Sequence, residues 1–402
     1  MERVVITGMG AITPVGNDVP SFWESLKTGK CGIGPITKFD VSDFKVKLGA
    51  EVKDFDPTQY MEKREARRAD ANVHYAMAAA IQAVEQAGLK EGNFDPYRTG
   101  VIFGSGVGGL HVAEQEVPKL LEKGPGRVSP FAIPEMIANI AAAYISMHFG
   151  FKGENFCPVS ACATGNHSIG EAMRAIRHGY QDGIIPISMA GFQNMKAVHM
   201  GDDPTAASIP FDARRSGFVM GEGAGCLVLE SLTHAQQRGA TILAEVAGYG
   251  ASGDAYHITS PSPDGEAAAH GIRGAIEDAG LTPADVDYIN AHGTSTPLNE
   301  KYETIAIKKA FGDEAYKVKV SSTKSMTGHL LGGAAAVEAI ACVMAIREGI
   351  VPPTIGYKEP DPECDLDYVP NTARKAEINA AMSNSLGFGG QNSSLIVAKY
   401  EK

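Results

Sequence analysis

Short runs of aliphatic residues alternate with helical segments rich in alanine and glycine along most of the chain. The apolar runs predict strands at 3–7, 101–103, 218–231, 242–248, 286–290 and 318–321, and a β-rich end up to residue 400. The segments between them predict helices at 19–29, 71–89, 134–149, 163–178, 233–239, 264–280, 299–311 and 330–348. Strands that alternate with helices are typical of sheets covered by helices on both faces. The order of elements therefore predicts an α/β protein.

A short internal repeat suggests that the chain contains two similar halves. The sequence AIRHG at 175–179 recurs as AIREG at 345–349, and each copy closes a helix rich in small residues. A match of five residues can also arise by chance. With 402 residues the chain is long enough for two to three packing units, at ~150 residues each. We therefore predict two domains, 1–241 and 242–402, and leave the duplication open at this point.

Charge and cysteine usage exclude several functions. The chain has 36 Lys and Arg against 47 Asp and Glu, a net charge of −11. Nucleic acid and anionic membranes repel such a chain, so neither is expected as a partner. No run of 18 or more apolar residues occurs, which predicts no membrane span. The N-terminus lacks the pattern of a signal peptide, and the six cysteines contain no CxxC motif. These features predict a cytoplasmic protein.

Cys162 lies in the segment SACATG, directly before the predicted helix 163–178. The N-terminus of a helix carries a partial positive charge and free N–H groups, which favour a thiolate. The small residues around the cysteine leave room for a thioester to approach. The segment therefore makes Cys162 a candidate nucleophile, with a buried structural cysteine as the alternative.

The segment NAHGTSTPLNE carries His292, Thr294 and Thr296 on a loop between a predicted strand and a predicted helix. Loops at the ends of strands commonly hold functional side chains in α/β proteins. Ser295 or Thr296 could instead only cap the helix at 299–311. Such a cap leaves His292 unexplained, so we consider it a candidate active-site residue.

The segment SSTKSMTGHLLGGAAAVEA places Lys324, His329 and Glu338 at another junction of a strand with a helix. The positive end of the following helix would keep the His329 imidazole neutral and able to donate a hydrogen bond. A hydrogen-bonded core histidine is the alternative. The argument for a site is the repetition, because one cysteine and two histidines each occupy such a junction.

Two glycine-rich segments permit unusual backbone conformations. NSLGFGGQNSSL places Phe388 between glycines, either for a close approach of the backbone or simply for a hairpin. GSGVGG at 104–109 fits the GxGxxG pattern of dinucleotide sites. The acidic residue that such a site needs on the next strand is missing, because Glu114, Glu116 and Glu122 fall in a helical stretch. No nicotinamide cofactor is therefore predicted.

A basic segment, EKREARRAD, places Arg64, Arg67 and Arg68 at the i, i+3 and i+4 positions of a predicted helix. Residues at this spacing share one helical face. Such a face is often only solvated. On an acidic chain, a local basic face can also attract an acidic partner.

Together these motifs resemble those of the β-ketoacyl-acyl carrier protein synthases, the condensing enzymes of fatty-acid synthesis, and most of all their type II members in bacteria and plastids. The resemblance runs from VVITGMGAITPVG to GFGGQNSSLIV and so spans the whole chain. It implies a thiolase-like fold with two similar βαβαβαββ halves in five layers, α-β-α-β-α. It also implies a homodimer, located in the cytoplasm or in the plastid stroma.

The resemblance implies a role for each candidate residue of the site. Cys162 would accept the acyl group, and His292 and His329 would form the active-site pair. Lys324 would lie beside them, and Glu338 would be the buried acid near this lysine. The backbone N–H groups of Cys162 and of the residue at 388 would form the oxyanion hole.

Other residues would contact the substrate or its carrier. Thr294 and Thr296 would line the path of the phosphopantetheine arm, Phe388 would be a mobile gate, and Val107 and Phe192 would line the acyl pocket. The implied partner is acyl carrier protein. The residues that would dock it are Arg64, Arg67, Arg68, Arg127 and Lys196.

The implied reaction begins when a fatty acyl group moves from carrier protein to Cys162. Malonyl-carrier protein then loses CO₂, and its carbanion attacks the acyl thioester. The product is a 3-oxoacyl-carrier protein that is two carbons longer. No metal and no cofactor are implied, apart from the 4′-phosphopantetheine that belongs to the carrier protein.

The sequence departs from the family pattern at three places. About nine residues expected before Phe192 are missing, in a region that leads to the dimer interface and the acyl pocket. Gln391 stands where many members have threonine, and Glu300 replaces a common aspartate. The missing segment puts the role of Phe192, the range of chain lengths and the packing of the dimer in doubt.

Three other readings are compatible with parts of this pattern. A chain-length factor of a polyketide synthase would be a non-catalytic partner, but such partners lose the nucleophile that this chain keeps as Cys162. A ketosynthase of a polyketide or polyunsaturated fatty-acid pathway would have the same active-site residues. Thiolases share the fold, but they lack HGTSTP and use a second cysteine.

Overall fold

The computed structural model describes residues 1–189 and 198–401. Within this part of the chain, ten strands form one sheet in the order β5-β4-β6-β7-β1-β8-β14-β13-β9-β10. The N-terminal strands are β1 (Val4–Ile12), β4 (Thr99–Ser105), β5 (Asn155–Phe156), β6 (Gly183–Met189) and β7 (Ala224–Ser231). The C-terminal strands are β8 (Ala244–Gly253), β9 (Tyr288–Asn290), β10 (Lys319–Ser321), β13 (Ala380–Gly387) and β14 (Gln391–Ala398).

The two halves of this sheet have the same topology. From the middle outward, the strands of the N-terminal half follow in the order β1, β7, β6, β4, β5, and those of the C-terminal half in the order β8, β14, β13, β9, β10. In both halves this is the first, fifth, fourth, second and third strand along the chain. In both halves, the first three strands of this order pair antiparallel with one another. The third pairs parallel with the fourth, and the fourth pairs parallel with the fifth. The halves are joined where Val5 and Ile6 of β1 pair with Glu245 and Ala244 of β8. The chain therefore contains two similar halves.

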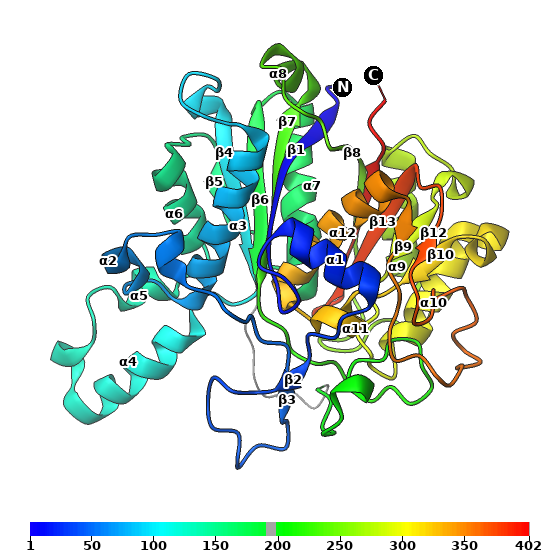
Figure 1. Cartoon of the computed structure of the whole chain (residues 1–402), viewed down its shortest axis with the longest axis horizontal. Coiled ribbons are helices and arrows are strands. Elements are labelled where there is room, and N and C mark those ends of the chain that lie inside the picture. Colours follow the sequence, from blue (N-terminus) through cyan, green and yellow to red (C-terminus); the bar gives the residue numbers. More distant parts are fainter. Residues whose placement is uncertain (190–197, 402) are drawn as a thin grey trace.

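Helices form three layers around the two halves of the sheet (Figure 1). In the middle, α7 (Thr164–Arg177) packs against β6 and β14, and α12 (Ala334–Glu348) packs against β7 and β13. On the outside, α3 (Ala71–Ala87) and α6 (Ile140–Phe149) cover the N-terminal half. On the opposite side, α9 (Glu266–Asp278) and α10 (Asn299–Phe311) cover the C-terminal half. The five-layer α-β-α-β-α arrangement implied by the resemblance is confirmed.

The other elements are short or lie outside these layers. The helices are α1 (Val19–Thr28), α2 (Lys63–Ala66), α4 (Leu110–Lys123), α5 (Ala132–Met136), α8 (Leu232–Gln237) and α11 (Lys324–Thr327). The strands are β2 (Gly34–Pro35), β3 (Leu48–Gly49), β11 (Ile350–Val351) and β12 (Arg374–Lys375). No helix in residues 1–189 and 198–401 has the length and apolar character that a membrane span requires.

Several predicted elements have different bounds in the structure. The helix predicted at 134–149 is two helices, α5 and α6, because Ile137 has an extended backbone with ψ of 142°. The helix predicted at 330–348 begins as a 3₁₀ turn over Leu331–Gly333 and becomes α-helical only at residue 334. The strand predicted at 218–231 begins at residue 224.

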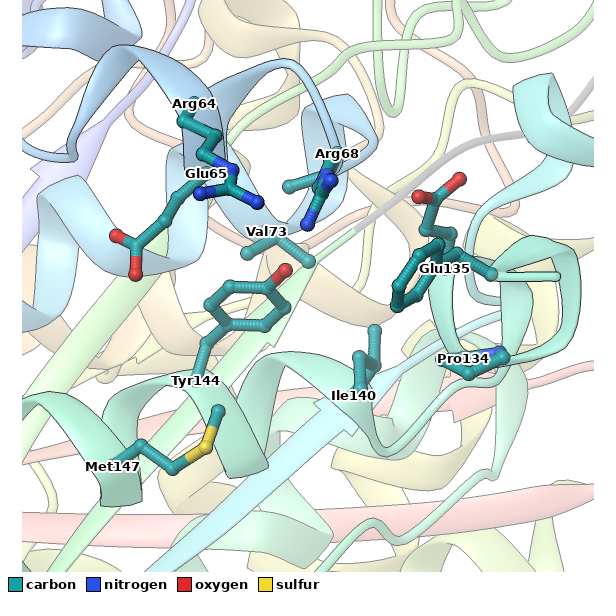
Figure 2. A pocket seen from close by; sticks show the side chains of 11 residues that line it. Arg64, Glu65, Arg68, Val73, Pro134, Glu135, Ile140, Tyr144 and Met147 are labelled. Carbon is teal, nitrogen blue, oxygen red and sulfur yellow. The ribbon is translucent and has the colours of Figure 1, made fainter. Parts of the chain in front are cut away.

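The predicted basic helix is also shorter than the sequence pattern indicates. α2 ends at Ala66, where the chain turns. Asp70 then caps the N-terminus of α3. Arg64 lies on α2, whereas Arg67 and Arg68 follow it in the turn. A single helical face shared by the three arginines is therefore wrong, although all three are exposed. Figure 2 shows Arg64 and Arg68 on one side of a hollow whose opposite wall comes from α5 and α6.

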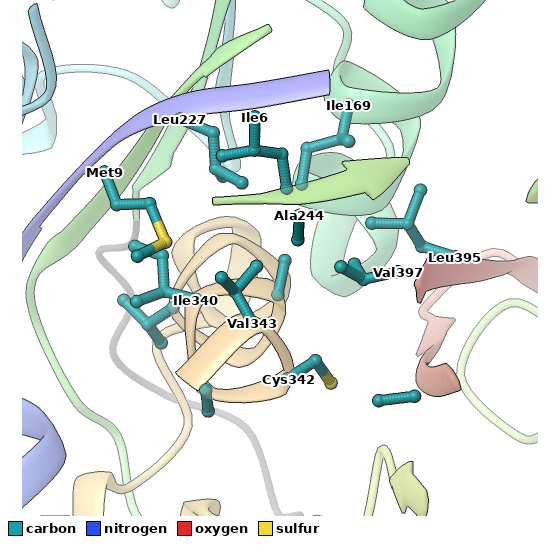
Figure 3. Close-up of a cluster of buried hydrophobic side chains, with 14 of the residues drawn as sticks. Ile6, Met9, Ile169, Leu227, Ala244, Ile340, Cys342, Val343, Leu395 and Val397 are labelled. Carbon is teal, nitrogen blue, oxygen red and sulfur yellow. The ribbon is translucent and has the colours of Figure 1, made fainter. Parts of the chain in front are cut away.

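The largest cluster of buried apolar side chains joins the two halves (Figure 3). It combines Ile6 and Leu227 of the N-terminal half with Leu395 and Val397 of the C-terminal half. Glycine and alanine let the middle helices approach each other closely, since a Cβ on Gly165 would lie only 2.9 Å from the Cβ of Ala335. This close packing fixes the start of α7 relative to the start of α12, and Cys162 and His329 lie shortly before these two helix starts.

Candidate active site

Cys162 lies in a 3₁₀ turn over Ala161–Ala163, directly before α7. Its side chain is 4% exposed. The preceding residue, Ala161, has φ of 49°, in the left-handed region that residues with a Cβ rarely occupy. The end of β13 packs against this turn, because a Cβ on Gly387 would lie 2.8 Å from the carbonyl oxygen of Ser160. The cysteine is therefore held in a strained turn between the two halves.

The imidazole of His329 contacts the sulfur of Cys162. Its Nε2 atom lies 3.0 Å from Sγ. The other ring nitrogen, Nδ1, accepts a hydrogen bond of 3.2 Å from the backbone N–H of Leu331. Because an accepting nitrogen carries no proton, the proton of a neutral ring must be on Nε2. His329 is therefore a hydrogen-bond donor that faces the sulfur.

His292 completes a cluster of three potential reacting side chains. Its ring centroid is 5.3 Å from that of His329, and the two rings are nearly perpendicular, at 83°. One side-chain atom each of Cys162, His292 and His329 lie within 4.8 Å of one another. The Nδ1 atom of His292 is buried and accepts or donates no hydrogen bond among the described residues. The predicted constellation of one cysteine and two histidines is thus brought together.

Both histidines are neutral at ordinary pH. Burial lowers the pKa of His292 and of His329 well below the usual value, and the positive charge of Lys324 lowers each pKa further. The sequence predicts a neutral His329 from the positive end of a helix. α12 begins five residues later, so burial is the main cause.

Burial also determines the state of the cysteine. It raises the pKa of the Cys162 thiol to about 11, although Lys324 and the backbone N–H groups of Phe388 and Cys162 act in the opposite direction. The predicted thiolate at a helix N-terminus is therefore wrong for this resting structure. The groups that oppose the rise are those that stabilise negative charge at the sulfur.

Lys324 and Glu338 form a buried ion pair beside the histidines, with both side chains 1% exposed. Nζ of Lys324 donates to Oε1 of Glu338, and the other carboxylate oxygen is buried without a partner among the described residues. Lys324 lies on α11 and Glu338 lies one turn into α12. Removing one member of such a pair leaves an uncompensated buried charge, so each requires the other.

The three side chains of the cluster would also suit a soft divalent metal, since thiolate and imidazole are ligands of Zn²⁺. The Nε2–H of His329 is, however, directed at the sulfur. The expectation that the site works without a metal stays a prediction.

Phe388 begins the short loop that joins β13 to β14. Its backbone N–H lies near enough to Cys162 Sγ to lower the pKa of the thiol. The loop is attached to the segment after β8: the N–H of Gly389 donates to Ile258, and Gly390 accepts from Asp254, at 2.7 and 2.8 Å. The Asp254 carboxylate also accepts from the side chain of Asn392, at 2.6 Å.

We expect Gly389→Ala to slow the overall reaction while leaving the fold intact. Gly389 has φ of 91°, which strains any residue with a Cβ, although a Cβ there would clash with nothing, since its nearest neighbour would be the Gln391 side chain at 3.7 Å. A stiffer or displaced loop would hinder the movement of Phe388. Steady-state rates together with circular dichroism test this expectation. The matched variant Gly390→Ala should be more damaging, because its Cβ would lie 2.7 Å from that of Asp254. An unchanged rate in Gly389→Ala would contradict a gating role.

Two family models together match most of the chain. The model described as "Beta-ketoacyl synthase, N-terminal domain" matches residues 1–235. The model described as "Beta-ketoacyl synthase, C-terminal domain" matches residues 243–358. The chain belongs to the beta-ketoacyl synthase family. The boundary predicted at 241/242 lies between the two matches and stays a prediction.

Curated members of the beta-ketoacyl synthase family resemble the chain over its full length. "3-oxoacyl-[acyl-carrier-protein] synthase 2" of Synechocystis is 52% identical over 410 residues, with 100% of this chain and 99% of the relative covered. The proteins of the same name in Coxiella burnetii and Staphylococcus aureus are 48% and 49% identical. For each of these two, at least 99% of both chains is covered.

Solved structures of beta-ketoacyl synthases have the same fold. A beta-ketoacyl synthase from Burkholderia phymatum superimposes with a TM-score of 0.93 at 32% identity, with both chains covered completely. A type II PKS ketosynthase, solved in complex with its acyl-carrier protein and bound to the hexaketide, gives 0.92 at 33% identity, again with complete coverage. The thiolase-like fold is thus confirmed.

Two buried carboxylates of this synthase were not identified from the sequence as parts of the site. Glu303 on α10 accepts hydrogen bonds from the backbone N–H groups of His292 and Gly293, at 2.7 and 2.8 Å. Glu300 accepts one from the N–H of Ser295. Burial raises the pKa of Glu300 to about 8. Helical spacing alone places 300 and 303 on one face of the helix, but only the fold shows that this face turns toward the loop.

Arg215 closes the other side of this loop. Its guanidinium donates to the carbonyl oxygens of Thr296 and Pro297, at 3.1 and 3.0 Å, and forms an ion pair of 2.6 Å with Asp361. It also lies 3.7 Å from Glu300. No sequence motif connects position 215 with this loop.

The loop holds the two threonines of the predicted substrate path together. Oγ1 of Thr294 lies 3.1 Å from Oγ1 of Thr296. Ser295 between them has φ of 72°, and its hydroxyl oxygen accepts from the N–H of Ile209. The N-cap of α10 is Leu298, without a side-chain bond. The alternative that Ser295 or Thr296 caps this helix is therefore wrong.

The remaining predicted residues are half-buried, exposed, or outside the described part of the chain. Val107 is half-buried in the loop after β4. Arg64, Arg67, Arg68 and Arg127 are exposed. Phe192 and Lys196 fall within residues 190–197, outside the described residues, and so does part of the region where nine residues are missing.

Proposed function

We propose that this synthase elongates fatty acyl chains by condensing an acyl group, carried on Cys162, with malonyl-carrier protein. The observation that carries the proposal is the cluster of one buried thiol and two neutral imidazoles, with Nε2–H of His329 3.0 Å from the sulfur. A neutral imidazole keeps one N–H group, which can donate a hydrogen bond to an oxygen.

The first half-reaction is thioester exchange. The sulfur of Cys162 attacks the acyl thioester of the carrier protein, forming one C–S bond as the other breaks. The proton of the cysteine thiol ends on the departing thiol of the carrier protein. In the tetrahedral intermediate, the backbone N–H groups of Cys162 and Phe388 would stabilise the oxyanion.

The second half-reaction forms the carbon–carbon bond. Malonyl thioester loses CO₂, and the electron pair of the broken bond becomes an enolate. Nε2–H of His329 and the imidazole of His292 would donate hydrogen bonds to the enolate oxygen. The carbanion then attacks the acyl thioester, and the Cys162 thiolate leaves and takes up a proton from water. The 3-oxoacyl product is two carbons longer. These steps balance without a metal or a nicotinamide.

A ketosynthase of a polyketide pathway is the second candidate. It is supported by the solved structure of a type II PKS ketosynthase, which is 33% identical. The curated relatives named 3-oxoacyl-[acyl-carrier-protein] synthase 2 are 48–52% identical. This difference supports fatty-acid elongation. The intact Cys162 argues against a non-catalytic partner like a chain-length factor.

The direct test incubates the purified protein with a series of acyl-carrier proteins and with malonyl-carrier protein. We expect an acyl adduct on the protein by intact-mass spectrometry and a 3-oxoacyl-carrier protein as the product. An adduct without condensation would contradict the proposed reaction. The series of acyl groups would also show the preferred chain length and separate fatty acyl from polyketide substrates.

We propose that acyl carrier protein docks on the basic surface formed by Arg64, Arg67, Arg68 and Arg127. These side chains are exposed. The guanidinium of Arg68 lies 5.0 Å from the ring of Phe131. On a chain of net charge −11, this surface is a local basic exception that suits an acidic protein.

Reversing Arg64, Arg67 and Arg68 to glutamate should raise the KM for carrier-bound substrate, by roughly tenfold at low salt. The effect should shrink as salt rises, since exposed charges are screened. Turnover of a small pantetheine thioester should be unchanged and serves as the control. If carrier-protein kinetics do not change at low salt, the arginines are only a solvated surface.

We also propose a homodimer. Large apolar side chains are exposed on four elements that contact one another in series, α4, α5, α6 and β5. They include Leu121 at 79%, Met147 at 70%, Ile133 at 62% and Phe156 at 42% exposure. β5 is also an edge strand, which a second copy could cover. Sedimentation tests the dimer, and a monomer at micromolar concentration would contradict it. A cytoplasmic location stays a prediction.

A further inference from the structure

Two polar side chains beside the nucleophile take no part in the proposed reaction. Ser160 lies two residues before Cys162, and His167 lies on the first turns of α7. The hydroxyl oxygen of Ser160 is 2.5 Å from Nδ1 of His167. Burial lowers the pKa of His167, so the ring is neutral at ordinary pH. A neutral ring forms this bond in either tautomer, because a hydroxyl both donates and accepts.

Ser160 is fixed to the following helix at three points. Its backbone N–H donates to Oγ1 of Thr164, at 2.9 Å. Its carbonyl oxygen accepts from the N–H of Ala163, at 3.0 Å. Its hydroxyl bonds to His167, which is the only one of the three contacts made between two side chains. The hydroxyl contact therefore reaches furthest along α7.

His167 is held in place from the other half of the molecule. The ring of Tyr249, on β8, meets the imidazole edge to face at 6.2 Å and 89°. Tyr249 fits there because position 170 is glycine, where a Cβ would lie 2.5 Å from the tyrosine ring. The imidazole is thus enclosed between the nucleophile turn and β8.

The residue between Ser160 and Cys162 is the strained Ala161, with φ of 49°. Such a conformation persists only where the surroundings hold it. The backbone N–H of Cys162 belongs to the peptide bond that follows Ala161, so the conformation of Ala161 sets its direction. If Ala161 relaxed to an ordinary conformation, this N–H would turn away from the position of the oxyanion.

We propose that Ser160 and His167 are positioning residues that hold Ala161 in its left-handed conformation and thereby keep the Cys162 N–H in the oxyanion hole. The inference rests on the proposed function, because it assumes that this N–H stabilises the oxyanion of the acyl group. The enolate, in contrast, would be stabilised by His292 and His329. Loss of the Ser160–His167 bond should therefore affect acyl transfer and spare decarboxylation.

The test compares Ser160→Ala, His167→Leu and the double variant. Acyl loading of Cys162 from acyl-carrier protein is followed by time-resolved intact-mass spectrometry, and CO₂ release from malonyl-carrier protein is measured separately. We expect each single variant to load about tenfold more slowly, since a misaligned donor costs less than the 10²–10³-fold of a missing one. The double variant should be no slower than the singles, because one shared contact is lost. CO₂ release and the KM for acyl-carrier protein should stay within about twofold.

Two further variants separate positioning from a general effect on the fold. His167→Asn keeps a hydrogen-bonding atom near the position of Nδ1 and should restore loading. His178→Leu replaces an exposed histidine at the far end of α7 and should load like the wild type. If His167→Leu does not fold, Ser160→Ala gives the same readout, since it removes only a hydroxyl.

The inference is overturned if Ser160→Ala and His167→Leu load like the wild type. It is also overturned if loading and CO₂ release fall together, if the losses multiply in the double variant, or if His167→Asn is as slow as His167→Leu. A wild-type protein that does not load at all would instead contradict the proposed function.

Discussion

Cys162→Ser should abolish the acyl-enzyme and lower condensation by at least ~10⁴-fold, the scale seen when a catalytic nucleophile is removed. Burial already raises the pKa of the thiol to about 11. A serine hydroxyl in the same buried position would ionise far less readily than this thiol. The Lys324 charge and the two N–H groups that favour a thiolate would not offset that difference. Intact-mass spectrometry after incubation with acyl-carrier protein measures the adduct directly.

Cys157→Ser is the matched control for this prediction. Cys157 lies five residues earlier, is half-buried, and directs its sulfur at the carbonyl oxygen of Pro158, 3.5 Å away. Burial raises the pKa of its thiol as it does for Cys162, but its sulfur contacts a backbone carbonyl, whereas that of Cys162 contacts an imidazole. We expect this variant to load and condense like the wild type. An acyl adduct that persists in Cys162→Ser, or disappears in Cys157→Ser, would show that the nucleophile is misassigned.

His292→Ala and His329→Ala should slow malonyl decarboxylation by ~10²–10³-fold each, the usual cost of one lost oxyanion donor. Acyl loading should fall less, because it depends mainly on the backbone N–H groups. His292→Ala should separate the two steps more cleanly, since His329 also contacts Sγ. Stopped-flow measurement of CO₂ release, beside intact-mass measurement of loading, compares the two half-reactions. Equal losses in both steps would contradict this division of roles.

The pH dependence provides a second check on the histidines. Both rings stay neutral at ordinary pH, because burial lowers their pKa well below the ordinary value, which is ~6.5. A lowered pKa means that the neutral form persists as the pH falls through that value. The rate of decarboxylation should therefore show no loss near pH 6.5. A loss there would mean that at least one ring is more exposed in the working enzyme.

Some failures of the sequence reasoning have a common physical cause. From the sequence, the protonation states of Cys162 and His329 are predicted from the partial charge at helix ends. In the structure, burial is the main cause of both states. Helix dipoles act over a turn, and their influence can be read from a sequence. Desolvation depends on every neighbour that excludes water, and most of these neighbours are distant in the chain.

Residues that no sequence motif identifies also depend on neighbours that are distant in the chain. Glu303 and Arg215 hold the loop of His292 from two sides, yet their own segments carry no chemical motif. Position 215 precedes the loop by about eighty residues, so only the fold brings the two together. The break between α5 and α6 was missed because an extended Ile137 leaves no proline or glycine to mark it.

The sequence by itself determined the alternation of strands and helices, the family, and the identity of Cys162, His292, His329 and Lys324 as candidates. These follow from local patterns, since each candidate lies at the end of a strand in a short motif of small residues. The tertiary structure decided how far apart these groups lie and which of them carry a proton. Packing of α7 against α12 places His329 Nε2 3.0 Å from the sulfur, and burial fixes the protonation of all three groups. Distances and desolvation arise only when the two halves close on each other, because each half contributes part of the site.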